Sequence, residues 1–152
     1  MEAHRTPLTR AELLAHLEAG WGRFLAALGR LSPADQAEWA RAQGYPRVED
    51  LLAHVCAWHE EGLHRVPALL VGEADPDYDI AAFNAQAVAQ YRGRSRAALE
   101  TEFTRLNAEL AAQIATLPDS ALANRDVYSW LYINAVEHYE EHRPPAGGEA
   151  AG

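Results

Sequence analysis

Two histidines stand four residues apart near the end of the sequence, in the stretch NAVEHYEEHRPP that covers residues 134–145. Residues four apart share one face of an α-helix, and His138 and His142 continue an apolar stripe that includes Leu131 and Ala135. On an inward face, the two imidazoles are placed to bind one metal ion. The spacing alone is weak evidence, because seven histidines in a chain of this length give such a pair by chance roughly a quarter of the time. The alternative is that both flank a frayed, exposed helix end.

A third ligand is needed, because a catalytic zinc usually has three protein ligands and one open position. The segment of residues 47–71 offers His54, His59 and His64. His59 and His64 are five residues apart, so a regular helix turns them about 140° from each other and they do not form an HExxH motif. His54 lies at the edge of the apolar stripe and His59 nearer its middle. Periodicity therefore leaves the choice between His54 and His59 open.

The elements that must position these histidines are helices. A Thr9–Glu12 capping box marks the first helix start. Hydrophobic residues then recur every three or four positions in four segments, which are expected to form helices over about 10–30, 47–71, 80–117 and 126–143. Ser32-Pro33 predicts a short helical turn, and Gly93 is expected to kink or split the third helix. The prediction is an all-α four-helix bundle formed by one domain, residues 1–143, with a disordered tail at 144–152.

Composition restricts the partners. The chain has 152 residues, of which 49% are hydrophobic and 23% charged, and its 13 basic residues, all arginine, face 22 acidic ones. The net charge of −9 repels phosphate backbones and anionic lipids, so neither nucleic acid nor a membrane is an expected partner. No apolar run reaches the length of a membrane span, and MEAHRTPLTR has no signal core. With a single cysteine, Cys56, we expect a cytoplasmic protein.

Three stretches together resemble a known family: LAHVCAW at 52–58, DIAAFN at 79–84 and EHYEEHRP at 137–144. They are similar to the DinB-like metal-binding four-helix bundles, also described as YfiT-like, and within them to the branch that includes ClbS and DfsB. The resemblance implies a metal site formed by His54, His138 and His142. The chain differs in having His59 directly after Trp58, where many relatives have an acidic residue, and this difference bears on the substrate more than on the metal.

The resemblance also implies a function. Relatives are known or proposed thiol-dependent transferases and isomerases that use a metal, which implies a divalent ion, zinc or nickel before iron or manganese, and a homodimer. We therefore expect an enzyme that acts on a small electrophilic molecule by thiol transfer or hydrolysis, with a low-molecular-weight thiol as a possible co-substrate. Glu61 is the candidate for a catalytic base, and Cys56 is expected to be a buried structural residue. The alternative is a non-enzymatic bundle that sequesters a small ligand, with structural histidines.

Overall fold

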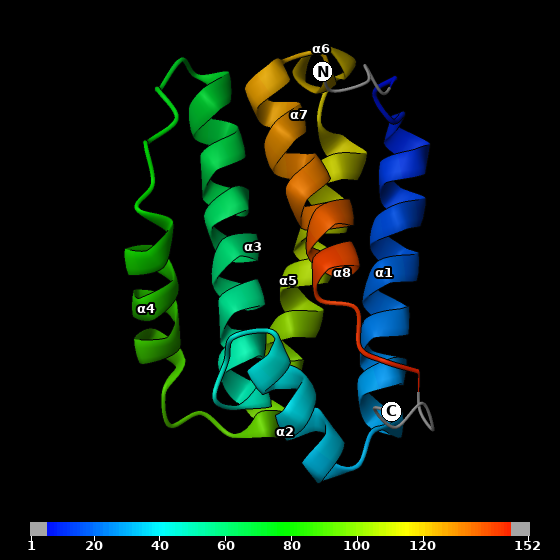
Figure 1. Ribbon diagram of the computed structural model, residues 1–152. Helices are drawn as coiled ribbons and strands as arrows, with labels where there is room; N and C mark the ends of the chain where they lie inside the picture. The colour runs from blue at the N-terminus through cyan, green and yellow to red at the C-terminus, as the bar shows by residue number, and fades with distance from the viewer. Residues whose placement is uncertain (1–5, 147–152) are drawn as a thin grey trace.

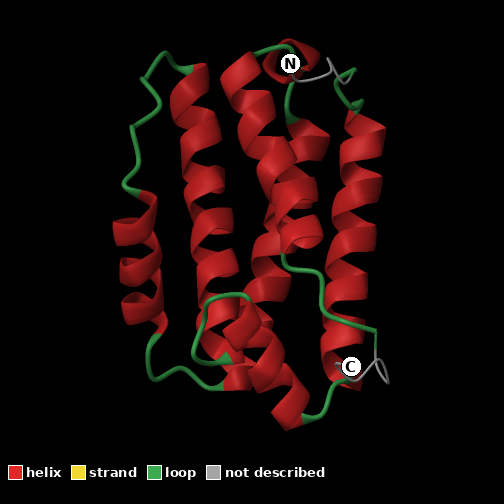
Figure 2. Ribbon diagram, in the orientation of Figure 1, coloured by secondary structure: helices red, strands yellow, loops and turns green. Residues whose placement is uncertain are grey.

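The computed structural model describes residues 6–146, and within this range every regular element is helical and no strand occurs (Figure 2). The all-helical class predicted from the sequence is confirmed. The elements are α1 (Arg10–Arg30), α2 (Pro33–Ala42), α3 (Val48–Leu70), α4 (Ile80–Tyr91), α5 (Arg96–Thr116), α6 (Asp119–Leu122), α7 (Arg125–Tyr132), the π-helix η1 (Ile133–Glu137) and α8 (His138–Glu141). Residues 147–152, most of the predicted disordered tail, lie outside the described residues.

The first two long helices follow the sequence pattern closely. Thr9 accepts a hydrogen bond from the Glu12 amide, and the Glu12 carboxylate accepts one from the Thr9 amide, so the predicted capping box is present. The buried residues of α1 recur four or seven positions apart: Leu13, Leu17, Phe24 and Leu28. α3 begins and ends within one residue of the predicted bounds. The histidine candidates of the middle segment therefore lie on one regular helix.

The predicted number of four helices is not confirmed. The expected helix over 80–117 is divided into α4 and α5 at Gly93, whose positive φ of 87° is accessible to glycine at no steric cost. The helical turn predicted at Ser32-Pro33 is the ten-residue α2. Figure 1 shows α1, α3, α5 and the α7–η1–α8 segment side by side, with α4 on the outer side of α3 and α2 across one end. No helix among the described residues has the length and apolar character required to cross a membrane.

The last helical segment contains a π-helical turn directly before His138. The His138 amide donates to the Ile133 carbonyl five residues earlier, and α-helical hydrogen bonding resumes with the bond from His142 to His138. A π turn adds a residue to a helical turn and rotates everything that follows. The predicted helix of 126–143 is therefore not one regular α-helix, and its last α-helical residue is Glu141, because Pro144 and Pro145 prevent its continuation.

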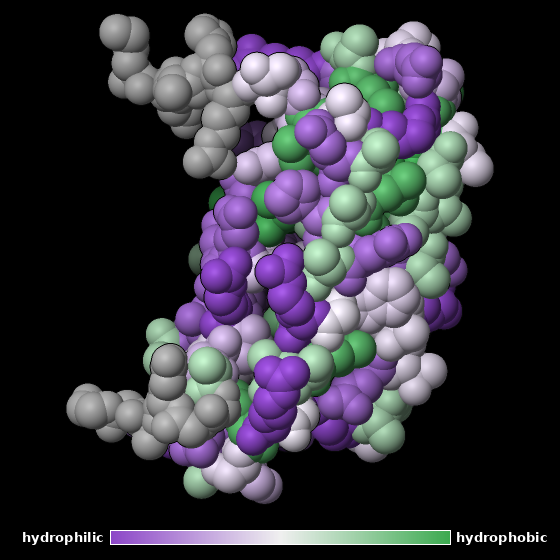
Figure 3. Space-filling view, turned by 90° about the vertical axis from the view of Figure 1, so that its right-hand side faces the viewer, coloured by the Kyte–Doolittle hydropathy of each residue, from purple (hydrophilic) through white to green (hydrophobic). Residues whose placement is uncertain are grey.

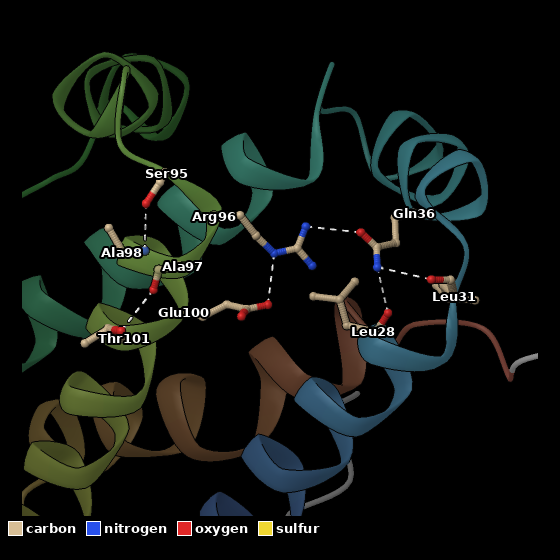
Figure 4. Close-up of polar contacts among 9 residues, drawn as sticks. All are labelled: Leu28, Leu31, Gln36, Ser95, Arg96, Ala97, Ala98, Glu100 and Thr101. Atoms are coloured by element: carbon tan, nitrogen blue, oxygen red, sulfur yellow. Dashed lines mark hydrogen bonds and ion pairs between the residues drawn. The ribbon is translucent and has the colours of Figure 1, made fainter.

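Polar contacts fix α2 against the rest of the bundle (Figure 4). The Gln36 side chain donates to the Leu28 and Leu31 carbonyls at the end of α1, at 2.9 and 3.3 Å. It also accepts a hydrogen bond of 3.1 Å from Arg96 on α5, which pairs with Glu100 as well. These bonds join three helices at one end of the bundle. They fix the first half of α2, and Gln43 directly follows the last residue of this helix.

Candidate metal centre

The side chains of His54, His138 and His142 converge between α3 and the end of the chain. The ring centroid of His54 lies 5.8 Å from that of His138 and 5.1 Å from that of His142, and the latter two are 6.0 Å apart. All three residues are buried, with exposed fractions of 7–8%. The inward alternative for the histidine pair is therefore the one observed. The exposed, frayed alternative is not.

Asn84 fixes the orientation of the His54 ring. Its side-chain oxygen accepts a hydrogen bond of 2.8 Å from Trp58 Nε1, and the same oxygen lies 3.0 Å from His54 Nδ1. Indole Nε1 can only donate, so the Asn84 atom that it contacts must be the oxygen, and His54 Nδ1 must then carry a hydrogen to donate to it. His54 Nε2 is left with its lone pair free, which is the state of a metal ligand.

The other two histidines also have a nitrogen without a protein partner. His142 Nδ1 lies 2.9 Å from the Gln43 side-chain oxygen, while His142 Nε2 and His138 Nδ1 are buried and have no hydrogen-bond partner. A buried polar atom without a partner costs about 1–3 kcal/mol unless a ligand or water satisfies it. Three imidazoles with such atoms are a suitable donor set for a divalent ion.

The site is wider than a formed metal site. No group of three or more His, Cys, Asp or Glu side chains between residues 6 and 146 has the arrangement that holds an ion. Imidazoles around one tetrahedral zinc, with Zn–N distances of ~2.0–2.1 Å, have ring centroids roughly 5 Å apart. Only the His54–His142 pair is that close, and the other two pairs are wider by less than 1 Å. Small side-chain rotations cover such a difference, so the three rings are close enough to approach one ion.

Burial keeps these imidazoles neutral. It lowers the pKa of His54, against the opposing effect of the hydrogen bond with Asn84, and it lowers the pKa of His142 to about 4, helped by the nearby His54. Burial, together with the neighbouring histidines His59, His54 and His142, holds the pKa of His138 well below its ordinary value. Neutral imidazole is the form that binds metal, so near pH 7 no proton has to leave before an ion binds.

His59, the alternative third ligand, lies deeper than the others. It is fully buried, neither of its ring nitrogens has a hydrogen-bond partner, and burial lowers its pKa to about 3. The nearby Asn134 main chain acts in the opposite direction and raises the pKa of His59, but it makes no hydrogen bond of ordinary geometry with the ring. The His59 ring lies 5.6 Å from His138 and contacts Phe103 and Tyr139. In the described part of the chain, His54 is the α3 histidine whose ring contacts both His138 and His142.

Glu61 does not lie beside the three histidines. It follows His54 by seven residues on α3, a rise of about 10 Å along the helix. Its carboxylate accepts hydrogen bonds from Arg65 Nε at 2.8 Å and from the Tyr78 hydroxyl at 2.5 Å. Burial opposes ionisation, but these two bonds outweigh it and lower the pKa of Glu61. A carboxylate held in this way fixes the 72–79 loop to α3 and is a weak proton acceptor.

Cys56 has no access to the histidines or to solvent. It is fully buried in the core, and burial raises the pKa of its thiol to about 12. The thiolate is the nucleophilic form of cysteine, so this residue is unreactive near neutral pH. The expectation of a structural cysteine is confirmed.

Three residues near the histidines were not assigned a role from the sequence. Asn84 lies in the DIAAFN stretch and was noted only as part of the resemblance, whereas Gln43 meets its partner across 99 residues, with no local signal. Tyr45 has its ring 5.2 Å from that of His54, and burial raises its pKa to about 12. The phenol therefore stays protonated and can act as a hydrogen-bond donor beside the site.

The family of the chain follows from a sequence comparison that covers this site and nearly all of the bundle. The model of the DinB superfamily matches residues 4–143. The chain belongs to the DinB superfamily. Neither a curated protein nor a solved structure matches the sequence. The match spans nearly all of the chain and includes the three converging histidines.

Proposed function

We propose that this DinB-superfamily protein is a metal-dependent enzyme that acts on a small electrophilic molecule, with His54, His138 and His142 as the ligands of a divalent ion. The observation that carries the proposal is the convergence of three buried imidazoles that burial keeps neutral, each with a ring nitrogen available to an ion. Membership in a superfamily whose members commonly bind metals supports it. Zinc or nickel fits best, because imidazole ligands favour these ions over manganese or magnesium.

A bound divalent ion would supply Lewis acidity, lowering the pKa of a coordinated water or thiol and polarising the electrophile. The chain's own side chains orient the site. Asn84 and Gln43 hold the Nδ1 atoms of His54 and His142, so that these rings cannot rotate freely. Tyr45, which remains protonated, can donate a hydrogen bond to an oxygen of the substrate.

An apolar wall continues from the histidines along α3 and α4. The rings of Trp58 and Phe83 lie 4.1 Å apart between their centroids, and Tyr78 packs against both at 5.5 and 5.8 Å. Trp58 also donates to Asn84, so this wall is joined directly to the His54 ligand. We propose that the wall contacts the apolar part of the substrate. The 72–79 loop borders it through Tyr78.

The family resemblance supplies the remaining parts of the proposal. A low-molecular-weight thiol would serve as co-substrate if the reaction is a transfer, and water would serve if it is a hydrolysis. The ClbS/DfsB branch, a homodimer and a cytoplasmic location are proposals of the same origin. Light scattering at micromolar concentration tests the dimer, for which a single monomeric species is the contrary result.

Turnover tests the proposal. Zinc- or nickel-loaded protein is mixed with panels of acyl, epoxide and strained-ring electrophiles, with and without cysteine, bacillithiol-type or mycothiol-type thiols, and loss of the electrophile is followed. We expect turnover that is lost in His138→Ala and kept in His64→Ala, the exposed histidine of α3, with circular dichroism verifying that both variants fold. Stoichiometric binding without turnover, unaffected by a chelator, would instead identify a bundle that sequesters its ligand.

A further inference from the structure

A cavity of about 540 Å³ lies between α1 and the segment of residues 135–146, and none of the three site histidines lines it. We propose that this cavity binds a small organic anion with an apolar body, of the chemical class of an aromatic carboxylate. Cavities of roughly 300–1,000 Å³ are typical of small-molecule sites. The inference concerns a second site and does not depend on the proposed function of the histidines.

The floor of the cavity is apolar and well fixed. Phe24 and Ala27 of α1 line it together with Val136 and Tyr139 from the opposite segment. The rings of Phe24 and Tyr139 contact each other edge to face at 6.0 Å, and both residues are buried. Gly20 lets this contact form, because a Cβ at that position would lie 2.8 Å from the Tyr139 ring. A flat aromatic body suits such a floor, because aromatic pairs gain about 0.5–1.5 kcal/mol beyond simple burial.

The rim of the cavity is positively charged. Arg23, Arg30 and Arg143 line it, and Glu140 is the single carboxylate among its lining residues. This concentration is unexpected in a chain with 13 basic and 22 acidic residues. Figure 3 looks onto the α1 side of the molecule, where hydrophilic residues in purple lie among hydrophobic ones in green.

These arginines have no carboxylate partner in the described part of the chain. Arg23 donates only to the Ala19 carbonyl of its own helix, and neither Arg30 nor Arg143 forms an ion pair. Among the described arginines outside the cavity, five pair with Asp or Glu, namely Arg10, Arg47, Arg65, Arg96 and Arg105, and four do not, namely Arg41, Arg92, Arg94 and Arg125. What distinguishes Arg23, Arg30 and Arg143 is that they line one cavity with an apolar floor. Acidic residues outnumber arginines in this chain, yet none of them pairs with these three guanidinium groups in the described residues. Their N–H donors are therefore available to an external anion. Guanidinium binds carboxylate with two parallel hydrogen bonds, which favours this group in the ligand.

Three probes that share one apolar body and differ in charge test the inference: 1-naphthoate, 1-naphthalenemethanol and 1-naphthylmethylammonium. Isothermal titration calorimetry at pH 7, with chelator present, should show one naphthoate bound per chain. We expect the neutral alcohol to bind at least about tenfold more weakly, because it lacks the charge-assisted bonds, and the cation to show no binding. Equal affinity for naphthoate and the alcohol, or no binding of naphthoate, would overturn the inference.

Variants locate the binding site. Arg30→Gln and Arg143→Gln should each weaken naphthoate at least about fivefold and leave the alcohol unchanged. Arg125→Gln, which removes an exposed arginine outside the cavity, is the matched control and should have no effect. Ala27→Phe fills the cavity and should abolish binding, with the fold verified by circular dichroism. Binding that survives Ala27→Phe, or that is lost in His54→Ala instead, would place the anion elsewhere and refute the proposal.

Discussion

Gly62 on α3 lies against the π turn that precedes His138, and alanine at this position tests how tightly that turn is held. A Cβ built on Gly62 would lie 2.1 Å from Asn134 Nδ2, far inside contact distance. Asn134 is 2% exposed, and its amide donates to the Trp58 carbonyl at 3.4 Å. The side chain therefore has little room to move, and Gly62→Ala must displace it or push the two helices apart.

The size of the stability change follows from one stabilising and two destabilising contributions. Alanine in place of glycine inside a helix stabilises by about 0.5–1 kcal/mol. Overpacking a core costs about 1–3 kcal/mol, and loss of the hydrogen bond from Asn134 costs about 0.5–1.5 kcal/mol. We expect Gly62→Ala to lower the free energy of unfolding by about 0.5–4 kcal/mol in total. In a protein of this size each kcal/mol lowers the melting temperature by about 2–4 °C.

The same substitution on α1 is the matched control. Gly22 and Gly29 are helical glycines, and a methyl group added at either position would have no atom within 4 Å apart from its chain neighbours and the backbone of its own helix. Gly22→Ala and Gly29→Ala should each raise the free energy of unfolding by about 0.5–1 kcal/mol. Urea unfolding followed by circular dichroism measures all three variants. If Gly62→Ala were stabilised as much as Gly22→Ala, Asn134 would not be confined there, and the close packing of α3 against η1 would be refuted.

Three further results are expected. Asn84→Ala should weaken zinc about 10–100-fold in chelator competition, because His54 loses the acceptor that fixes its ring, whereas Asn84→Asp keeps an acceptor and should retain the affinity; equal loss in both would contradict this role. Native Cys56 should not react with a thiol reagent at pH 8 but should react in urea, and rapid labelling of the folded protein would show an accessible thiol. In the metal-free protein, His142 takes up a proton near pH 6.5 when the chain is unfolded but only near pH 4 when it is folded. The free energy of unfolding should therefore be constant above pH 7 and should fall as the pH is lowered from about 6.5 to about 4. Stability that rises on acidification would contradict the burial of His142.

The helices were predictable from the sequence because their signals are local. The capping box at Thr9 and the three-to-four spacing of hydrophobic residues are complete within each segment, so the bounds of α1 and α3 follow from them. The π turn has no such local signal. In this turn Asn134 packs against Gly62 of α3, which lies 72 positions earlier in the sequence. No pattern within the last helical segment indicates that contact.

The candidate site was predictable in part for a similar reason. Periodicity reports burial, and it correctly placed His59 nearer the middle of the stripe, since His59 is fully buried and His54 is 7% exposed. The degree of burial does not indicate which rings lie next to one another. In the structure it is His54 whose ring contacts both His138 and His142. Two residues orient the rings: Asn84 lies in α4, and Gln43 follows the end of α2. Their roles depend on tertiary packing, which a single sequence does not encode in any local spacing.

Metal content tests the central proposal most directly. Protein purified without a histidine tag is loaded with zinc, passed through a desalting column and analysed for bound metal. We expect about one ion per chain in the wild type, and the same in His64→Ala, whose exposed imidazole lies on the same helix. His54→Ala, His138→Ala and His142→Ala should each lose the ion while remaining folded. If His54→Ala retained one ion with unchanged affinity, the three-histidine site proposed here would be wrong.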